Sequence, residues 1–164
     1  RNGVKVLIFF DVGGSMDPYI QSCEELFSAA KTEFKHMEYF YFHNFIYEGV
    51  WKDNNRRTKE RTDTWDILRT YSSDYRVIFV GDATMSPYEI NSVGGSVEHW
   101  NEEPGEVWMR RVTDKFDKVI WLNPEPETSW EFTTSVAWAR RLVEEKMYPR
   151  TLKGLDEGMR LLAR

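Results

Sequence analysis

One segment near the start of the chain limits the possible folds more than any other. Val4 to Phe10 is almost continuously apolar, which is typical of a strand buried on both faces of a parallel sheet. Asp11 follows directly, then a small-residue loop that ends with Ser15, and then Asp17-Pro18, which predicts an N-cap followed by proline at the first helical position. This order places Asp11 and Ser15 at the carboxyl end of a strand, where open α/β sheets bind ligands.

The rest of the chain continues the alternation of strands and helices. We expect strands over 38–43, 46–51, 76–80 and 118–122, with 46–51 at an edge or antiparallel, and helices over 17–34, 64–71, 104–116, 132–146 and 152–162. Ser86-Pro87-Tyr88-Glu89 is a capping-box pattern that predicts a further helix start. The pattern predicts the α/β class, as a Rossmann-like three-layer sandwich whose mostly parallel sheet has one antiparallel edge strand and helices on both faces. Residues 1–164 are expected to form a single domain.

Composition excludes several classes of protein. Hydrophobic residues make up 41% of the 164 residues and aromatic residues 15%. This composition argues against an intrinsically disordered protein and is enough for a folded core. The net charge of -5 argues against a nucleic-acid-binding protein, which would present a basic surface. The run from Arg56 to Arg61 is a local basic exception, and we interpret it as a solvated loop.

Cysteine use and apolar runs bear on where the protein works. Cys23 is the only cysteine, so an intrachain disulfide is impossible, and we predict a reducing, cytoplasmic location. The longest apolar run, 6–10, is far too short to span a bilayer, so no membrane insertion is expected. Because the chain begins at Arg1 rather than Met, we expect it to be a fragment of a longer polypeptide.

Three loops offer oxygen ligands near strand ends. The first carries Asp11 and Ser15, the second is Arg61-Thr62-Asp63-Thr64 before an expected helix, and the third carries Asp82 directly after the strand over 76–80. The carboxyl ends of parallel strands meet at one edge of a sheet, so the side chains of Asp11 and Asp82 are expected to converge. Oxygen ligands suit a hard cation such as Mg²⁺, with Mn²⁺ or Ca²⁺ as alternatives.

These loops resemble the metal-ion-dependent adhesion site (MIDAS) of von Willebrand factor A (VWA) domains. That family builds the site from Asp-x-Ser-x-Ser, a distant Thr and a distant Asp. The resemblance implies that Asp11 and Ser15 match the first loop, Thr62 the Thr and Asp82 the last acid, so that these four residues hold the metal. It covers nearly the whole chain, through the order of elements as well as the motifs.

Three phrases resemble more narrowly the bacterial, cytoplasmic CoxE-like group of VWA proteins. They are Phe42-His43-Asn44, the stretch from Val80 to Glu89, and Trp121-Leu122-Asn123-Pro124. Relatives in that group are often linked to MoxR-type AAA+ ATPases and help to mature or remodel metalloenzymes and other complexes. The resemblance therefore implies a protein partner, either such an ATPase or its client.

The chain departs from the family pattern at Gly13, which stands where the first Ser of the motif belongs. Glycine has no side-chain oxygen, so we expect water to fill this ligand position and the metal to bind more weakly, at millimolar Mg²⁺. We also expect Gly13-Gly14 to give the loop access to positive φ.

The same polar residues have ordinary structural roles open to them. Asp11 and Asp82 can cap helices or accept hydrogen bonds from loop amides, and Thr64 can cap a helix as well as Thr62 can. We interpret His43 as a structural residue, and His99 likewise, because a lone imidazole does not make a metal site. Tryptophans in or near loops form a binding surface if exposed and cover the sheet edge if buried; these are Trp51, Trp65 and Trp100.

Taken together, the motifs favour a binding module over an enzyme. A cation at this site would keep an open coordination position, which an acidic residue of a protein partner would complete. One alternative is a degenerate VWA domain that binds partners without metal, since one ligand of the motif is missing. A less favoured alternative is a metal-dependent hydrolase, but a haloacid dehalogenase-type phosphatase needs an acid where Gly13 stands, and no G-x-S-x-G nucleophile elbow occurs.

Overall fold

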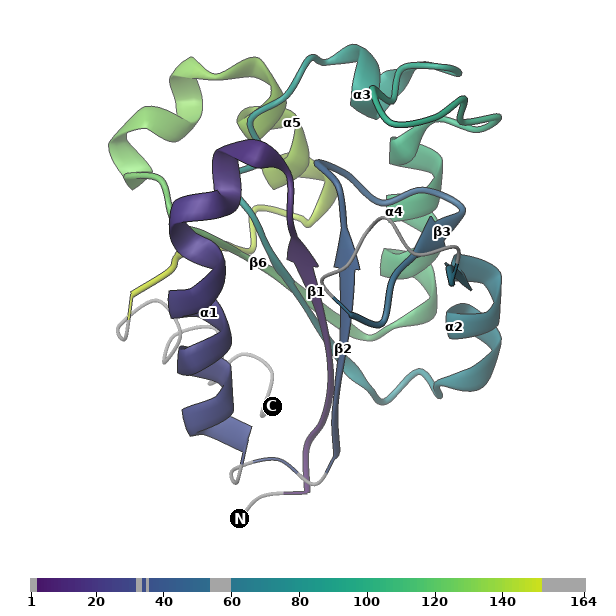
Figure 1. The fold of residues 1–164 in the computed structure, drawn as a ribbon, viewed down its shortest axis with the longest axis vertical. Helices are drawn as coiled ribbons and strands as arrows, with labels where there is room; N and C mark the ends of the chain where they lie inside the picture. The colour runs from purple at the N-terminus through teal and green to yellow at the C-terminus, as the bar shows by residue number, and fades with distance from the viewer. Residues whose placement is uncertain (1–2, 32–33, 35, 54–59, 152–164) are drawn as a thin grey trace.

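The centre of the molecule is a five-stranded parallel sheet between layers of helices (Figure 1). The computed structural model describes residues 3–31, 34, 36–53 and 60–151. The strands are β1 (Lys5–Asp11), β2 (His36–Phe42), β3 (Gly49–Val50), β4 (Thr62–Asp63), β5 (Arg76–Val80), β6 (Lys118–Asn123) and β7 (Met147–Pro149). The α-helices are α1 (Asp17–Ala30), α2 (Thr64–Thr70), α3 (Tyr88–Asn91), α4 (Gly105–Lys115) and α5 (Thr134–Leu142), with 3-10 turns η1 (Gly14–Met16) and η3 (Glu127–Phe132).

The strand order is β2-β1-β5-β6-β7, and every neighbouring pair in this sheet is parallel. Phe10 pairs with Tyr41 on one side and with Val80 on the other, and Val80 pairs with Leu122. The strands therefore end at the same level, and their carboxyl ends form one edge, which faces upward in Figure 1. This confirms the α/β class and the parallel sheet.

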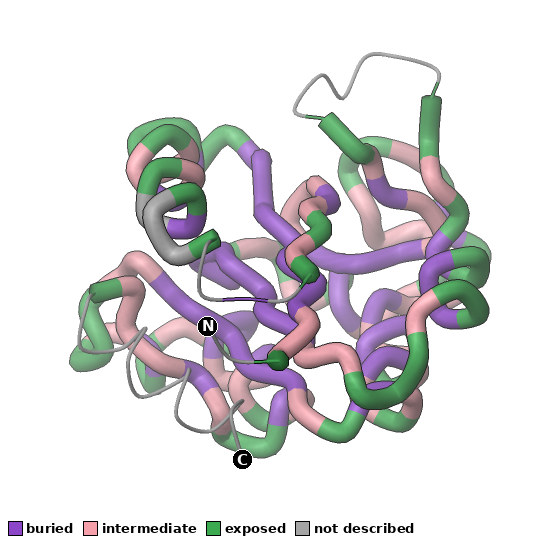
Figure 2. The backbone as a smooth tube through the Cα atoms, turned by 90° about the horizontal axis from the view of Figure 1, so that it is seen from below, coloured by how far each residue is buried: buried purple, intermediate pink, exposed green. Residues whose placement is uncertain are grey.

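Successive side chains of each strand point to opposite faces of the sheet, so the molecule has one core on each face. Leu7 and Phe9 face a cluster that includes Ile67 of α2 and Trp108 of α4, whereas neighbouring β1 side chains face a cluster with Phe27 of α1. A strand buried on both faces needs apolar residues at every position, which explains the unbroken apolar run of β1. Figure 2 shows this as buried backbone through the middle of the molecule, with exposed helix surfaces around it.

The antiparallel edge strand expected over 46–51 is reduced to short pieces. β3 pairs antiparallel with β4 in a separate two-stranded sheet, and a single antiparallel bridge joins Trp51 to Tyr41 of β2. The edge of the large sheet is thus extended by one residue pair rather than by a full strand.

The end of the described chain differs from expectation. The helix expected over 132–146 is instead η3, then α5, and the chain returns as the parallel strand β7, which the periodicity does not predict. Glu144 and Glu145 adopt positive φ, at 55° and 65°, which ends the helix although both residues are good helix formers.

The helix expected over 152–162 and the basic residues 56–59 lie outside the described residues. No described helix has the length and apolar character that crossing a bilayer would require.

Candidate functional site at the carboxyl edge of the sheet

Two buried carboxylates mark the carboxyl edge of the sheet. Asp11 is the last residue of β1, and Asp82 lies two residues beyond the end of β5, the neighbouring strand. Phe10 pairs with Val80, and a Cβ added to Gly81 would stand 2.8 Å from the Cβ of Asp11. Asp11 and Asp82 therefore follow adjacent strands at the same edge, as the strand order predicts.

Both carboxylates accept hydrogen bonds from the main chain. Oδ1 of Asp11 accepts from the amides of Gly13 (2.8 Å) and Asn44 (2.9 Å). Oδ1 of Asp82 accepts from the amide of Thr84 (3.0 Å). These bonds compensate part of the hydration lost on burial and fix the direction of each carboxylate. The structural role expected as an alternative, bonding to loop amides, is therefore present at both residues.

Ser15 lies in η1, one turn beyond Asp11, and is exposed to solvent. Its hydroxyl belongs to the loop that joins β1 to α1, which rises from the same edge of the sheet (Figure 1). A ligand arriving from solvent can reach this part of the loop.

Thr62 lies apart from the five-stranded sheet. It pairs with Val50 of β3, so that β3 and β2 come between its strand and β1. The neighbouring Thr64 is buried, and its hydroxyl donates to the main-chain oxygen of Tyr47 (2.5 Å). Neither threonine caps α2, because the side chain of Asp63 does so. The structure thus brings Asp11, Ser15 and Asp82 to one edge and places Thr62 in the small sheet beside it.

A partly buried polar network, which the sequence motifs do not predict, lies beside Asp11. Asn44 has a left-handed backbone, with φ of 62°, and its Nδ2 donates to Oε1 of Glu89 (3.0 Å). The other carboxylate oxygen of Glu89 accepts from the amide of Ser86 (3.1 Å), and its main-chain oxygen accepts from the Tyr47 hydroxyl (2.7 Å). The capping-box pattern predicts the Ser86–Glu89 contact. No sequence pattern predicts the contact between Glu89 and Asn44, which joins residues 45 apart.

Gly13 has a backbone that any residue can adopt, with φ of -59° and ψ of 155°. Among the glycines that the structure describes, only Gly94 has positive φ, so the expected use of positive φ at Gly13-Gly14 is wrong. What surrounds Gly13 is more restrictive than its backbone. A Cβ added there would overlap Oδ1 of Asn44 and lie 3.1 Å from Oδ1 of Asp11.

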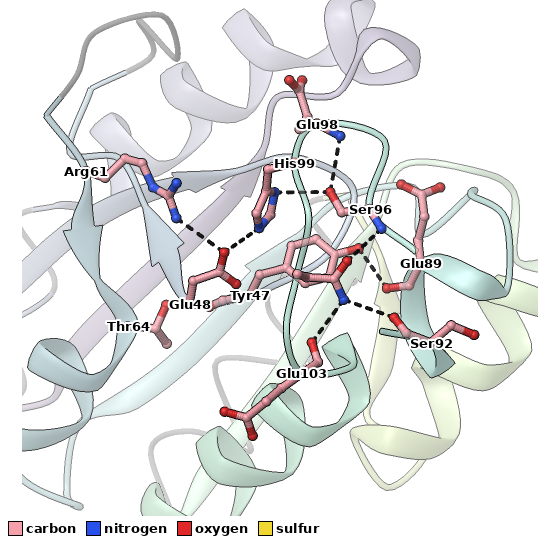
Figure 3. A network of polar contacts seen from close by, with 11 residues as sticks. Tyr47, Glu48, Arg61, Thr64, Glu89, Ser92, Ser96, Glu98, His99 and Glu103 are labelled. Atoms are coloured by element: carbon pink, nitrogen blue, oxygen red, sulfur yellow. Dashed lines mark hydrogen bonds and ion pairs between the residues drawn. The ribbon is translucent and has the colours of Figure 1, made fainter. Parts of the chain in front are cut away.

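A cavity of about 190 Å³ opens beyond residues 43–47, and two histidines line it. Nε2 of His43 lies 3.2 Å from Oε1 of Glu98, and Nε2 of His99 lies 2.5 Å from Oε1 of Glu48. Figure 3 shows Glu48 between His99 and Arg61, whose Nη2 is 3.5 Å from the same oxygen.

Within residues 3–31, 34, 36–53 and 60–151, no group of three or more His, Cys, Asp or Glu side chains is placed to hold a metal ion. A cation at the sheet edge would therefore need hydroxyl or amide oxygens beside its carboxylates.

Two tryptophans are exposed beside the small β3–β4 sheet, at the start of α2 and in the loop before α4. Trp100 is 71% exposed and Trp65 is 37% exposed, whereas Trp51 is partly buried. The loop that carries Trp100 is held by Asn101, whose Oδ1 accepts from the Ser96 amide (2.9 Å) and whose Nδ2 donates to the main-chain oxygens of Ser92 and Glu103. Exposure of Trp100 on a fixed loop fits a binding surface better than a lid over the sheet.

No protein-family model matches the chain, and neither a curated protein nor a solved structure matches it.

Proposed function

We propose that this protein is a metal-dependent protein-binding module of the VWA type. In this proposal a hard cation, Mg²⁺ for preference, lies at the carboxyl edge of the sheet and is held by Asp11 and Asp82 with hydroxyl ligands from Ser15 and Thr62. The observation that carries the proposal is the placement of two buried carboxylates after adjacent parallel strands. Ligand sites of open α/β sheets lie at such an edge.

The donor chemistry supports a hard cation. Carboxylate and hydroxyl oxygens are the ligands that Mg²⁺ prefers, and Mg²⁺ keeps water in the remaining positions. The hydrogen bonds to Oδ1 of Asp11 and of Asp82 do not conflict with this role, because a carboxylate has a second oxygen. Thr62 would have to reach the cation from the small sheet, since its strand lies outside the five-stranded sheet.

The proposed partner is a protein that presents an acidic residue. Asp11 and Asp82 supply two negative charges, and a bound divalent ion would offset them and attract a further carboxylate at its open position. The exposed Trp100 would add apolar contact area if the partner also covers the loop before α4. A MoxR-type AAA+ ATPase or its client is the partner that the resemblance to CoxE-like proteins suggests. Recognition of this kind requires no turnover, so we propose no enzymatic activity.

One observation favours a second candidate, a VWA-like domain that binds its partner without metal. The amide bonds to Asp11 and Asp82 are sufficient reason for both acids to be present at buried strand ends. In that case exposed aromatic residues such as Trp100 would carry the binding.

A pull-down separates the two candidates. The wild-type protein and an Asp11→Asn variant are immobilised and exposed to cell extract in either MgCl₂ or EDTA. Asp11→Asn keeps the shape of the side chain and one acceptor oxygen while removing its charge, and a thermal melt in EDTA checks that the variant is folded. Metal-dependent recognition predicts a protein captured by the wild type in Mg²⁺ and lost in EDTA and in the variant. Capture that is equal in all four conditions would rule it out and support the metal-free candidate.

A further inference from the structure

Asn44 lies against Gly13, the position at which the side-chain oxygen of the motif is missing. The backbone of Gly13, with φ of -59° and ψ of 155°, would accept a serine without strain. The obstacle is Oδ1 of Asn44, which a Cβ on Gly13 would overlap. An amide oxygen from a different loop therefore occupies the space in which the first Ser side chain of the motif would lie.

Contacts with Glu89 fix which end of the Asn44 amide faces Gly13. Nδ2 donates to Oε1 of Glu89, and a carboxylate can only accept, so the NH₂ group must face Glu89 and Oδ1 must face away from it. Glu89 is itself buried and is held by the amide of Ser86. The amide oxygen is thus oriented by a buried carboxylate, each oxygen of which accepts a hydrogen bond.

The backbone of Asn44 is also fixed. Its amide donates to Oδ1 of Asp11, and its φ of 62° lies in the left-handed region that asparagine tolerates better than most residues. Asp11 and Asn44 are therefore held together by a bond that does not involve the Asn44 side chain. This leaves Oδ1 of Asn44 as a neutral oxygen beside Asp11 and Gly13.

We propose that Oδ1 of Asn44 replaces the missing serine hydroxyl as a ligand of the cation at this edge. This role for Asn44 depends on the cation site proposed above. Asparagine carbonyl oxygens are established ligands of hard cations, and a neutral amide in place of a neutral hydroxyl leaves the charge of the ligand set unchanged. The protein thus needs no water in that position, and a glycine at 13 is required because a larger residue would displace Asn44. Glu89 is a positioning residue that acts through the Asn44 amide.

The test exchanges the Asn44 amide oxygen for a serine hydroxyl at position 13 and measures metal binding directly. Mn²⁺ is titrated into the wild type, into Asp11→Asn and into three further variants, and free Mn²⁺ is followed by its electron paramagnetic resonance signal. Asn44→Gly removes the amide oxygen and suits the left-handed backbone. Gly13→Ser adds a hydroxyl against an intact Asn44, and the double variant Gly13→Ser/Asn44→Gly restores the hydroxyl in the space that Asn44 has left.

We expect Asn44→Gly to weaken Mn²⁺ binding by about tenfold or more, since loss of even an indirect contact to a metal typically costs that much. Gly13→Ser alone should lower the melting temperature in EDTA, because it pushes the Asn44 amide off Glu89. The double variant should bind Mn²⁺ more tightly than Asn44→Gly. Thermal melts in EDTA confirm that each variant is folded.

The outcomes distinguish failure of the Asn44 role from failure of the cation site. If the wild type binds Mn²⁺, Asp11→Asn does not, and Asn44→Gly binds as tightly as the wild type, Asn44 is not a ligand while the site itself stands. If Asn44→Gly and the double variant bind Mn²⁺ equally weakly, the exchange of oxygens is also refuted. If the wild type takes up no Mn²⁺ at millimolar concentration, both the site and the role of Asn44 are overturned.

Discussion

Asp11 is fully buried at the end of β1, and an ionised carboxylate in such a place needs polar partners nearby. Two amides, from Gly13 and Asn44, donate to its Oδ1 and hold two separate loops against one side chain. A single residue therefore joins the loop after β1 to the loop after β2. Any change at Asp11 acts on both loops, which is why Asp11→Asn is a better probe of charge than a truncation.

Cys23 provides a residue-scale prediction outside the site. It lies in α1 against the sheet, and burial raises the pKa of its thiol to about 11, against an opposing effect of the Arg150 charge. Since the thiolate is the reactive form, the native thiol should react with a disulfide reagent such as DTNB at pH 8 about a hundredfold more slowly than the unfolded chain in urea. Similar rates with and without urea would contradict the burial of Cys23.

The same pKa shift predicts how stability changes with pH. The folded pKa is above the unfolded value of about 8.5, so the stabilisation is fully present below pH 8.5 and is lost as the pH rises toward 11. Cys23→Ala removes this contribution, and its free energy of unfolding should fall less steeply over that range than that of the wild type.

At the scale of elements, the loop over 92–103 is held in one conformation by specific side-chain contacts. Gly94 has a φ of 68°, and a Cβ there would overlap the ring of Trp100, so glycine is required both by the backbone and by the packing. Asn101 is fully buried beneath the loop and bonds the main chain of Ser96, Ser92 and Glu103. One amide side chain thus substitutes for the secondary structure that the loop lacks.

Replacing Asn101 with aspartate tests this account of the loop. Asn101→Asp keeps an acceptor for the Ser96 amide but loses both donations and brings a negative charge toward two carbonyl oxygens. We expect a loss of about 1–3 kcal/mol in the free energy of unfolding, measured by urea denaturation with an unchanged m-value. Glu102→Gln, at an exposed neighbouring position, is the control and should leave the midpoint unchanged. Equal midpoints for both variants would show that Asn101 does not hold the loop.

Elements with a strong period or an unbroken apolar run could be predicted from the sequence. The strands β1, β5 and β6 and the helix α4 fall within about two residues of expectation, because burial on both faces or on one face leaves a clear pattern. The strand β7 could not be predicted, since it is three residues long and follows good helix formers whose backbone is set by the tertiary fold. The strand expected over 46–51 is shorter than its apolar pattern indicates, because Ile46 and Tyr47 are buried in the core without belonging to a strand.

The candidate site was predictable only where it depends on strand order. The shared edge of Asp11 and Asp82 follows from counting strands and helices. The placement of Asn44 beside Gly13 does not, because it depends on a left-handed turn and on Glu89 from a distant loop. Sequence similarity to a motif likewise could not place Thr62, whose strand position depends on how the 43–51 segment turns away from the sheet.

At the scale of the whole molecule, the sheet separates two cores. The loops that follow its strands all begin at the same edge. Strand ends that lie level with each other bring residues from distant parts of the chain to that edge. An ion bound there would be linked to β1 and β5, two adjacent interior strands of the sheet, so its binding energy would add to the stability of the entire fold rather than to one loop. Global stability is therefore a direct reporter of the proposed site.

The most direct test is a thermal melt of the protein in EDTA and across a Mg²⁺ titration, with Asp11→Asn beside the wild type. The cation site predicts a saturable rise in melting temperature of roughly 5–10 °C when free Mg²⁺ exceeds its dissociation constant a hundredfold, and no such rise in the variant. A wild-type melting temperature that stays constant up to roughly 100 mM Mg²⁺, a hundredfold above a millimolar dissociation constant, or one that rises equally in Asp11→Asn, would contradict a metal site at this edge of the sheet.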